Sequence, residues 1–394
     1  MAKNKKKKIV LAYSGGLDTS VIIRWLMERG YEVVCYMGDV GQGDDTERAR
    51  KRALKIGATK CIVGDLKKKF ITDYAFRALK AGSLYQGKYN LATALSRPII
   101  AESIVSVAKK EGAVAVAHGC TGKGNDQVRF EVTFHLMGPS LKVMAPVREW
   151  ELTTRESEID YAKKHKVPIE QTKKKSYSID LNLWGISIES GKLEDPWVEP
   201  PSDTFISVVP PEKAPAKAQY VTVGFKKGIP VSINGRKYTP VELVGKLNKM
   251  AGVHGVGRVD MVEDRLVGIK SREIYEAPAS TVLYAAHGAL EELVLDRETR
   301  RYKQSFADRY AEIVYNGLWF TPVKSAIDAF VDETQVRVSG EVKLKLYKGN
   351  VTVCGRKSSN SRYKMELATY GEGDVFDQSL AKGFIDLWAM PYKE

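Results

Sequence analysis

The sequence has few of the residues that build disulfides and metal centres. Its four cysteines, Cys35, Cys61, Cys120 and Cys354, form no C-x-x-C pair, and its five histidines follow no H-E-x-x-H spacing. Neither a disulfide framework nor a zinc site can be read from this pattern. We therefore expect a protein of a reducing compartment that holds no transition metal.

A long apolar run is also missing. No segment approaches the roughly 20 apolar residues of a membrane-spanning helix. The basic start, with Lys5 to Lys8, leads into an apolar stretch that ends at Ala12 in a Gly-rich loop, which is not the pattern of a secretory signal. We expect a soluble, cytoplasmic protein with no membrane partner.

Basic residues outnumber acidic ones, which gives a net charge of +14 over 394 residues. Such a charge suits a nucleic-acid partner, but equally an anionic substrate or a solvated lysine-rich surface. The lysine runs at 67–69 and 173–175 are not interleaved with aromatic residues, as a base-stacking surface would be. We interpret the charge as a solvated surface and expect no nucleic-acid partner.

The first half alternates short β-branched apolar runs with longer amphipathic ones, the pattern of an α/β fold with a parallel sheet. Strands are expected at residues 9–13, 32–36, 61–63, 113–117 and 142–146, and helices at 19–29, 44–56, 98–110 and 154–165. Parallel sheets bind ligands at the carboxyl ends of their strands. Two of these ends lead into polar, Gly-rich loops, from Ser14 and from His118, which should face one crevice.

The second half has the mixed pattern of an α+β domain. Hairpins are expected at residues 220–233 and 336–353, helices at 240–251, 279–298 and 322–332, and a last amphipathic piece at 377–388. Periodicity weakens between residues 173 and 215, which are rich in Pro, Ser and Lys. We place the domain boundary near residues 167–175.

The first loop, A-Y-S-G-G-L-D-T-S at residues 12–20, lies between a strand and a helix. Its glycines let backbone amides approach an anion, and the start of the helix attracts negative charge. Asp18 is placed to hold Mg²⁺ through oxygen. A tight turn capped by Asp18 is the alternative, but the whole order of strand, S-G-G-x-D-[ST]-[ST] and helix favours a phosphate site that is neither a Walker A loop nor a dinucleotide fingerprint.

A second loop, from Ala117 to Glu131, again follows a buried strand and concentrates glycines with polar and charged side chains. Together, the first loop, H-G-x-T-G-K-G-N-D-Q-V-R-F-E from His118 and G-V-G-R-V-D at 255–260 resemble the argininosuccinate synthase family of ATP pyrophosphatases. The likeness extends over nearly the whole chain. It implies a nucleotide-binding domain of the adenine nucleotide alpha hydrolase type at 1–170, a synthetase and multimerisation domain at 171–374, and an oligomerisation tail at 375–394.

The resemblance implies a carbon–nitrogen ligase of arginine biosynthesis or the urea cycle. In that family the ureido oxygen of citrulline attacks the α-phosphate of ATP, and the aspartate amine then displaces AMP from citrullyl-AMP. Adenylation turns a poor leaving group into a good one and divides a difficult step into two. The resemblance also implies Mg²⁺, citrulline and aspartate as small-molecule partners, and a homotetramer.

The resemblance assigns site residues position by position. Those implied for ATP are Ala12, Tyr13, Ser14, Gly15, Gly16, Leu17, Asp18, Thr19, Ser20, Gly38 and Gly119. Those implied for aspartate are Thr121, Asn125 and Asp126. Those implied for citrulline are Tyr89, Asn125, Arg129, Ser178, Ser187, Glu263 and Tyr275. We expect Asp18, Asp126 and Arg129 to carry catalysis, with Arg129 on the citrulline carboxylate and Glu263 on its amine.

Three alternatives remain at this point. A tRNA-thiolating enzyme shares the first loop and would suit the positive charge, but no persuasive catalytic cysteine pair is present. A glutamine-dependent amidotransferase would need a glutaminase nucleophile, and the chain starts Met-Ala-Lys rather than Met-Cys. An ATP-binding sensor would not need the charged motifs of the second half. His118 could be a general base, but we expect a hydrogen-bonded strand-end residue, and we expect no thiol chemistry from Cys120.

Overall fold

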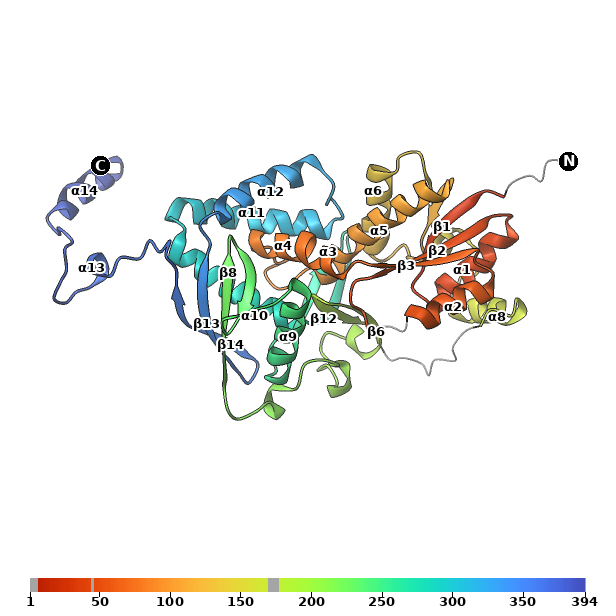
Figure 1. Ribbon diagram of the computed structural model, residues 1–394, viewed down its shortest axis with the longest axis horizontal. Coiled ribbons are helices and arrows are strands. Elements are labelled where there is room, and N and C mark those ends of the chain that lie inside the picture. The colour runs from red at the N-terminus through yellow and green to blue at the C-terminus, as the bar shows by residue number, and fades with distance from the viewer. Residues whose placement is uncertain (1–5, 44–45, 169–176, 394) are drawn as a thin grey trace.

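The structure, a computed structural model, describes residues 6–43, 46–168 and 177–393. The first half builds a five-stranded parallel sheet in the order β3-β2-β1-β4-β5 (Figure 1). Its strands are β1 (Lys8–Ala12), β2 (Glu32–Asp39), β3 (Lys60–Asp65), β4 (Ala115–Ala117) and β5 (Lys142–Met144). The expected α/β class is confirmed, and the predicted strand at 142–146 ends two residues early, because Pro146 opens a helix.

Helices cover both faces of this sheet. Ile9 and Leu11 of β1 pack with α1 (Leu17–Glu28), α2 (Thr46–Ile56) and α8 (Arg155–Lys164), whereas Val10 packs with α5 (Ala92–Glu111) and α6 (Asp126–Met137). Successive residues of a strand point to opposite faces of the sheet. A sheet with helices on both faces therefore needs apolar residues at every strand position. That requirement explains the continuous apolar runs by which these strands were predicted.

Helix α5 begins at Ala92, and the prediction that it starts near Pro98 was wrong. Proline favours the first turn of a helix because it lacks the N–H that is unpaired there. Here the first-turn amides have another partner, since the hydroxyl of Tyr89, three residues ahead of the helix, accepts from the Thr93 amide at 2.9 Å and from the Ala94 amide at 3.4 Å. The helix therefore extends one and a half turns ahead of the proline.

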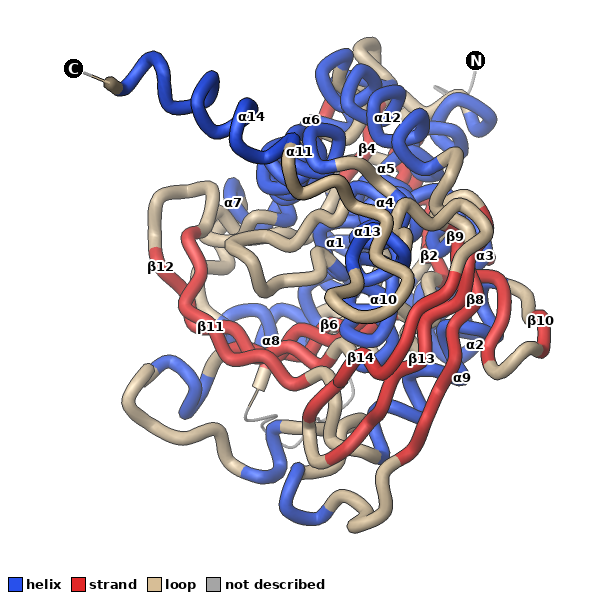
Figure 2. Tube along the Cα trace, turned by 90° about the vertical axis from the view of Figure 1, so that its left-hand side faces the viewer, coloured by secondary structure: helices blue, strands red, loops and turns tan. Residues whose placement is uncertain are grey.

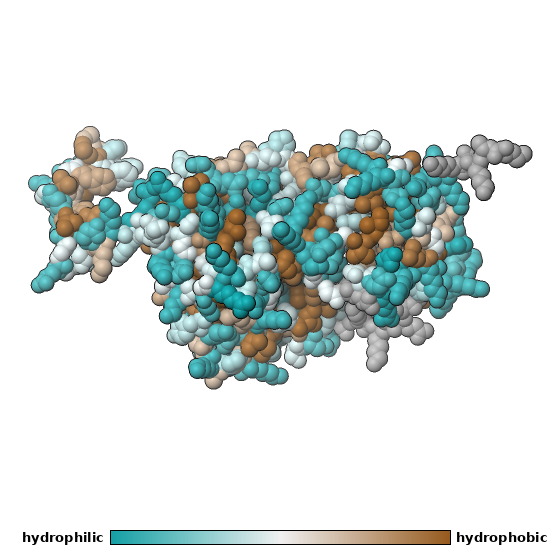
Figure 3. Space-filling model, viewed as in Figure 1, coloured by the Kyte–Doolittle hydropathy of each residue, from teal (hydrophilic) through white to brown (hydrophobic). Residues whose placement is uncertain are grey.

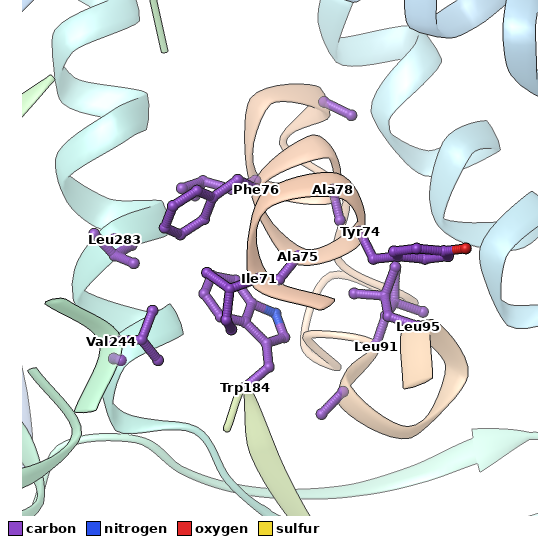
Figure 4. Close-up of a cluster of buried hydrophobic side chains, with 14 of the residues drawn as sticks. Ile71, Tyr74, Ala75, Phe76, Ala78, Leu91, Leu95, Trp184, Val244 and Leu283 are labelled. Atoms are coloured by element: carbon purple, nitrogen blue, oxygen red, sulfur yellow. The ribbon is translucent and has the colours of Figure 1, made fainter. Parts of the chain in front are cut away.

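Between β3 and α5 the chain forms α3 (Lys67–Lys69), a π-helical turn (Phe70–Ala75) and α4 (Phe76–Ala81), which were not predicted. This segment packs into the core of the second half. Phe76 lies edge-on to Trp184 with ring centroids 6.3 Å apart, and Figure 4 shows both beside Val244 and Leu283. The two halves of the chain thus share one apolar core.

The second half contains two antiparallel sheets. The four-stranded sheet has the order β11-β12-β7-β6, built from β6 (Ser178–Asn182), β7 (Gly185–Glu189), β11 (Arg258–Asp264) and β12 (Lys270–Glu276). The five-stranded sheet has the order β10-β9-β8-β13-β14, built from β8 (Gln219–Lys226), β9 (Ile229–Ile233), β10 (Arg236–Lys237), β13 (Gly340–Tyr347) and β14 (Asn350–Lys357). Both predicted hairpins are confirmed.

Four long helices accompany these sheets, namely α9 (Pro240–Val253), α10 (Pro278–Val294), α11 (Arg297–Tyr315) and α12 (Pro322–Gln335). The prediction of one helix over 279–298 was wrong. The chain turns at Leu295, and Asp296 caps a new helix by accepting a 2.9 Å hydrogen bond from the Thr299 amide. Helix α11 was missed because its charged first half has no apolar period.

After β14 the chain stays bonded to the body as far as Arg362, whose amide donates to the Leu293 carbonyl. It then forms an arm, residues 363–393, with α13 (Met365–Ala368) and α14 (Leu380–Ala389), which Figure 1 shows projecting outward, as Figure 2 does for α14. Short turns complete the elements: α7 (Pro146–Glu149), η2 (Gly191–Glu194), η3 (Ser202–Thr204), η4 (Pro211–Lys213) and η5 (Met390–Tyr392). Within the described ranges, no helix is long and apolar enough to cross a membrane.

Candidate active site

The first loop joins β1 to α1 at the carboxyl edge of the parallel sheet. Gly15 has φ of +80°, and a Cβ there would lie 3.0 Å from the Cβ of Ala49, so backbone conformation and space both favour glycine. Ser14 Oγ accepts a 3.3 Å bond from the Gly16 amide and lies 3.1 Å from Thr19 Oγ1. Since no described side chain caps α1 at Gly16, its first-turn amides can receive an anion.

The second loop meets the first directly. Strands β1 and β4 are parallel neighbours, with Leu11 opposite Ala117. A Cβ on Gly119 would lie 3.1 Å from Thr19 Cγ2, so a side chain there would separate the two loops. The expectation that both loops face one crevice therefore has a geometric basis in Gly119.

Gly38 lies on β2 under α5. A Cβ there would approach Ile100 Cγ1 to 2.8 Å and Leu66 Cδ1 to 3.0 Å. Arg52 of α2, which the sequence did not single out, donates a 2.6 Å hydrogen bond to the carbonyl of Gly15. The absence of a side chain at Gly38 lets α5 pack closely on the sheet, and Arg52 holds the backbone of the first loop in place.

Asp18, in the first turn of α1, faces Glu158 of α8. Burial, followed by the charge of Asp18, raises the pKa of Glu158 to about 8. Glu158 Oε2 is enclosed and has no hydrogen-bond partner among the described residues. The pair therefore carries less than two negative charges near neutral pH, and Glu158 was missed because nothing local in its helix marks it.

The second loop ends where Asp126 begins α6, between two guanidinium groups. Arg97 Nε lies 2.8 Å from Asp126 Oδ2 and Arg129 Nη1 lies 3.0 Å from Oδ1, while Arg97 also pairs with Asp180 of β6. Burial opposes ionisation of Asp126, but the two arginines outweigh it and leave its pKa below the usual value. Asp126 is thus a carboxylate at neutral pH, and Arg97 and Asp180 are contacts that the sequence did not reveal.

The residues expected at the citrulline site mostly converge. Tyr89 stacks on Tyr275 with ring centroids 4.1 Å apart, and the Tyr275 hydroxyl donates a 2.5 Å hydrogen bond to Glu263 Oε2. Arg129 and Glu263 are 4% and 3% exposed. Burial raises the pKa of Glu263 although its hydrogen bonds and Arg129 act against this. Arg129 and Glu263, which have opposite charges, thus lie in one buried cluster of aromatic side chains.

Of the expected serines and Thr121, only Ser187 adjoins this cluster, and the other two are exposed. Ser187 lies opposite Tyr275 in the β7–β12 register, and its hydroxyl is 2.9 Å from that of Thr93. Ser178 is exposed at the start of β6, two residues before Asp180 and on the same face of the strand. Thr121 is exposed on the loop that precedes Asp126.

Tyr315, the last residue of α11, contacts several members of the pocket although the sequence did not single it out. Its hydroxyl lies 2.5 Å from Glu263 Oε1 and 2.8 Å from Asn125 Nδ2. Its carbonyl accepts a 3.0 Å bond from Arg129 Nε. Because α11 was not predicted, no sequence signal placed this tyrosine near the two loops.

The hydrogen bonds of His118 and the burial of Cys120 indicate structural roles for both residues. The Cys120 amide donates to His118 Nδ1 at 3.1 Å, so the His118 proton is on Nε2, which lies 2.9 Å from Glu131 Oε1. Burial raises the pKa of Cys120 to about 12, which keeps it a thiol. Both observations agree with the expectation of a hydrogen-bonded histidine and an unreactive cysteine.

Comparison with known proteins places these features in a family. Residues 8–168 match the arginosuccinate synthase N-terminal HUP domain, and residues 177–394 match the arginosuccinate synthase C-terminal domain. The argininosuccinate synthase of Carboxydothermus hydrogenoformans is 54% identical over 388 residues, which is 98% of this chain and 97% of the relative. That of Aquifex aeolicus is 55% identical over 391 residues, 99% of this chain and 98% of the relative. The parallel sheet, the two loops and full-length similarity agree, and the chain belongs to the argininosuccinate synthase family.

Proposed function

We propose that the crevice between the two loops and the four-stranded sheet is where this ligase makes its product. The reaction of the family joins L-citrulline to L-aspartate with ATP and yields argininosuccinate, AMP and pyrophosphate, a step of arginine biosynthesis. The assignment of the site to this crevice rests on one observation. A buried cation, Arg129, and a buried anion, Glu263, lie in one aromatic cluster with Asn125 of the second loop, and Gly119 of that loop lies against Thr19 of the first loop.

In this proposal, residues 12–20 hold the phosphates of ATP. Amides at the start of α1 and the hydroxyls of Ser14 and Thr19 offer donors to a polyanion. Gly119 keeps the second loop against the first, so that an ATP α-phosphate and a substrate bound to the second loop can approach. Proximity of this kind lowers the barrier of a two-substrate reaction substantially.

The residues present fit Mg²⁺ as part of the nucleotide complex. Mg²⁺ takes oxygen ligands and is often held by one or two carboxylates together with substrate phosphates. Asp18 supplies a carboxyl group in the first turn of α1, and the described part of the chain contains no cluster of three or more such ligands. Mg²⁺ would neutralise phosphate charge when bound, and Asp18 would hold it at the first loop.

Citrulline would lie with its carboxylate on Arg129 and its amine on Glu263, beside Tyr89 and Tyr275. A zwitterion needs one group of each sign, and a guanidinium binds a carboxylate in a two-pronged way. Ser187, next to Tyr275, would contact the same substrate, and exposed Ser178 would lie at its outer end. Arg129 also bonds Asp126, so it adjoins the aspartate site.

Aspartate would be bound by Thr121, Asn125 and Asp126. Because the pKa of Asp126 is below its usual value, this carboxylate is better suited to hold the aspartate ammonium than to remove its proton. The amine that results from proton loss would then displace AMP from the citrullyl adenylate. In this mechanism Asp126 therefore orients the aspartate amine.

The test follows one oxygen atom. If the ureido oxygen attacks the α-phosphate, citrulline labelled there with oxygen-18 yields AMP that carries the label. Citrulline without aspartate should also support exchange of labelled pyrophosphate into ATP, because the first step is reversible. Unlabelled AMP, in an assay that forms argininosuccinate, would overturn the adenylate mechanism.

We also propose a homotetramer in which the arm takes part. Helix α14 exposes the large apolar side chains of Leu380, Phe384, Ile385, Leu387 and Trp388. Figure 3 shows hydrophobic (brown) atoms on the surface of the arm. Exposed apolar patches of this kind mark interaction surfaces. Light scattering of the chain and of a version without residues 375–394 tests this, with loss of the assembly expected in the shortened chain.

A cytoplasmic location fits the cysteines. Cys35 and Cys61 face each other on adjacent strands β2 and β3 as free thiols. Neighbouring free thiols suit a reducing compartment. Fractionation of the source cells, with enzyme activity assayed in each fraction, would check this placement.

A further inference from the structure

Tyr315 lies at the centre of the amino-acid pocket, yet no motif of the two loops includes it. It is 1% exposed and ends α11, far along the chain from the residues it touches. We propose that Tyr315 is a positioning residue that holds Glu263 as a carboxylate and ties it to Asn125 of the second loop. This inference rests on the proposed function, because it names what keeps the citrulline-binding anion in place.

The direction of the hydrogen bonds at Tyr315 is determined by its neighbours. The Leu266 amide donates to Asn125 Oδ1 at 2.9 Å, so the NH₂ group of Asn125 is the side that faces Tyr315, at 2.8 Å. That NH₂ can only donate, and the Tyr315 oxygen therefore accepts. The single hydroxyl proton of Tyr315 must then point to Glu263 Oε1, 2.5 Å away.

Glu263 consequently receives a phenol proton on each oxygen. Tyr315 donates to Oε1 and Tyr275 donates to Oε2, both at 2.5 Å. Hydrogen bonds to the charged form of a carboxyl group favour that form and oppose the effect of burial. Burial raises the pKa of Glu263, and these two bonds with Arg129 limit the rise. Loss of either hydroxyl leaves the carboxyl easier to protonate.

The ring and backbone of Tyr315 also contact Arg129. The ring stacks on Tyr85 at a centroid distance of 3.6 Å and 8° between planes. The Arg129 guanidinium carbon lies 4.9 Å from the Tyr315 ring centre, and Arg129 Nε donates to the Tyr315 carbonyl. One residue thus touches Asn125, Arg129 and Glu263, all of which are expected to bind citrulline.

The variant Tyr315→Phe separates the hydroxyl from the ring, because the stack on Tyr85 and the carbonyl contact remain. Loss of this hydrogen bond to a charged group should lower kcat/KM for citrulline by roughly 10- to 100-fold at neutral pH. We expect the KM for citrulline to rise while the KM for ATP stays unchanged. The acidic limb of the pH profile of kcat/KM should move to higher pH, because Glu263 protonates more easily.

Tyr284→Phe is the matched control. The Tyr284 hydroxyl donates to the Ser83 carbonyl at 2.8 Å, outside the amino-acid pocket, and this variant should keep the wild-type citrulline KM and pH profile. Tyr275→Phe, which removes the other phenol donor, should shift the acidic limb in the same direction. A lower kcat in Tyr315→Phe with unchanged citrulline KM and unchanged profile would overturn the proposal.

A measurement without substrate separates this inference from the proposed function. A carboxyl group whose pKa is raised by folding stabilises the fold below its unfolded pKa, and that contribution is lost as pH rises through the folded pKa. In Tyr315→Phe the folded pKa of Glu263 should be higher still, so the melting temperature should fall further below wild type as pH rises above the folded pKa that Glu263 has in the wild-type protein. A difference that is constant with pH would refute the inference even if the enzyme assay succeeds. A pH-dependent difference would support it even if citrulline proved not to be the substrate.

Discussion

The first loop and the proposed amino-acid site differ in how they are assembled. The first loop is nine consecutive residues whose chemistry depends on a strand end, two glycines and the start of α1. The pocket brings together Tyr89, Arg129, Glu263 and Tyr315, which lie on four separate segments of the chain. A contiguous site can be recognised from local order, whereas a dispersed site depends on the packing of elements that the sequence does not pair.

The largest expected effect concerns the first loop, where Asp18→Asn should reduce turnover by about 100- to 1,000-fold while ATP binding changes little. Loss of a group that stabilises charge in the transition state has effects of this size. Single-turnover rates and ATP affinity, measured on the same preparation, check this expectation. The control is Asp160→Asn, since Asp160 is exposed on α8 and paired only loosely with Lys163. Near-normal turnover of a folded Asp18→Asn protein would remove Asp18 from the chemistry.

In the pocket, Arg129→Lys should raise the KM for citrulline by about 10- to 100-fold and change the KM for aspartate less. A lysine offers a point charge in place of the planar fork, and it cannot keep the contacts to both Asp126 and the Tyr315 carbonyl. Steady-state kinetics with each substrate varied in turn measure the difference. Arg309→Lys, in an exposed pair with Glu312, serves as the control. A dominant effect on aspartate would mean that the two amino-acid positions are reversed.

A smaller effect is expected from Glu158→Gln, which tests whether folding raises the pKa of Glu158 beside Asp18. The folded pKa of Glu158 is raised to about 8, so its contribution to stability is present below the unfolded pKa near 4.3 and is lost as pH rises through about 8. The variant should therefore gain stability relative to wild type between these values, with a melting temperature higher by about 1–3 °C at pH 9. An equal difference at pH 5 and pH 9 would show that folding does not raise the pKa of Glu158.

The smallest effect is expected at the basic start of the chain. Lys3 and Lys5 lie outside the described residues, and the prediction that the lysine-rich start is a solvated tail without a catalytic role remains a prediction. Removal of residues 2–7 should leave turnover unchanged, which a standard assay measures. Lys8 is kept because it begins β1 and lies 3.1 Å from Glu111. A large loss of activity, or of a bound polyanion, would reopen the nucleic-acid alternative.

The gaps in prediction share a physical origin. Helix α11 has a charged first half, and its buried apolar face begins only at Ala307, so the helix was not predicted and Tyr315 was missed with it. Arg97 follows a buried helical turn and looks like an ordinary surface arginine until Asp126 and Asp180 are placed on either side. The domain boundary near 167–175 stays a prediction, and it lies partly outside the described residues. The π-helical turn and α4 could not be predicted, because their apolar residues pack into a core that is formed together with the second half.

The sequence by itself determined the parallel sheet, both hairpins of the second half and the Gly-rich turn between β1 and α1, because each depends on alternation or spacing among neighbouring residues. That this turn binds phosphate stays a prediction. The sequence also determined, through family motifs, which residues to look for. Only the tertiary structure decided that Glu263 receives two phenol protons, that Asp126 lies between two arginines, and that Glu158 faces Asp18. Charge and protonation depend on burial and on neighbours within a few ångströms, and those neighbours come from remote segments that only folding brings together.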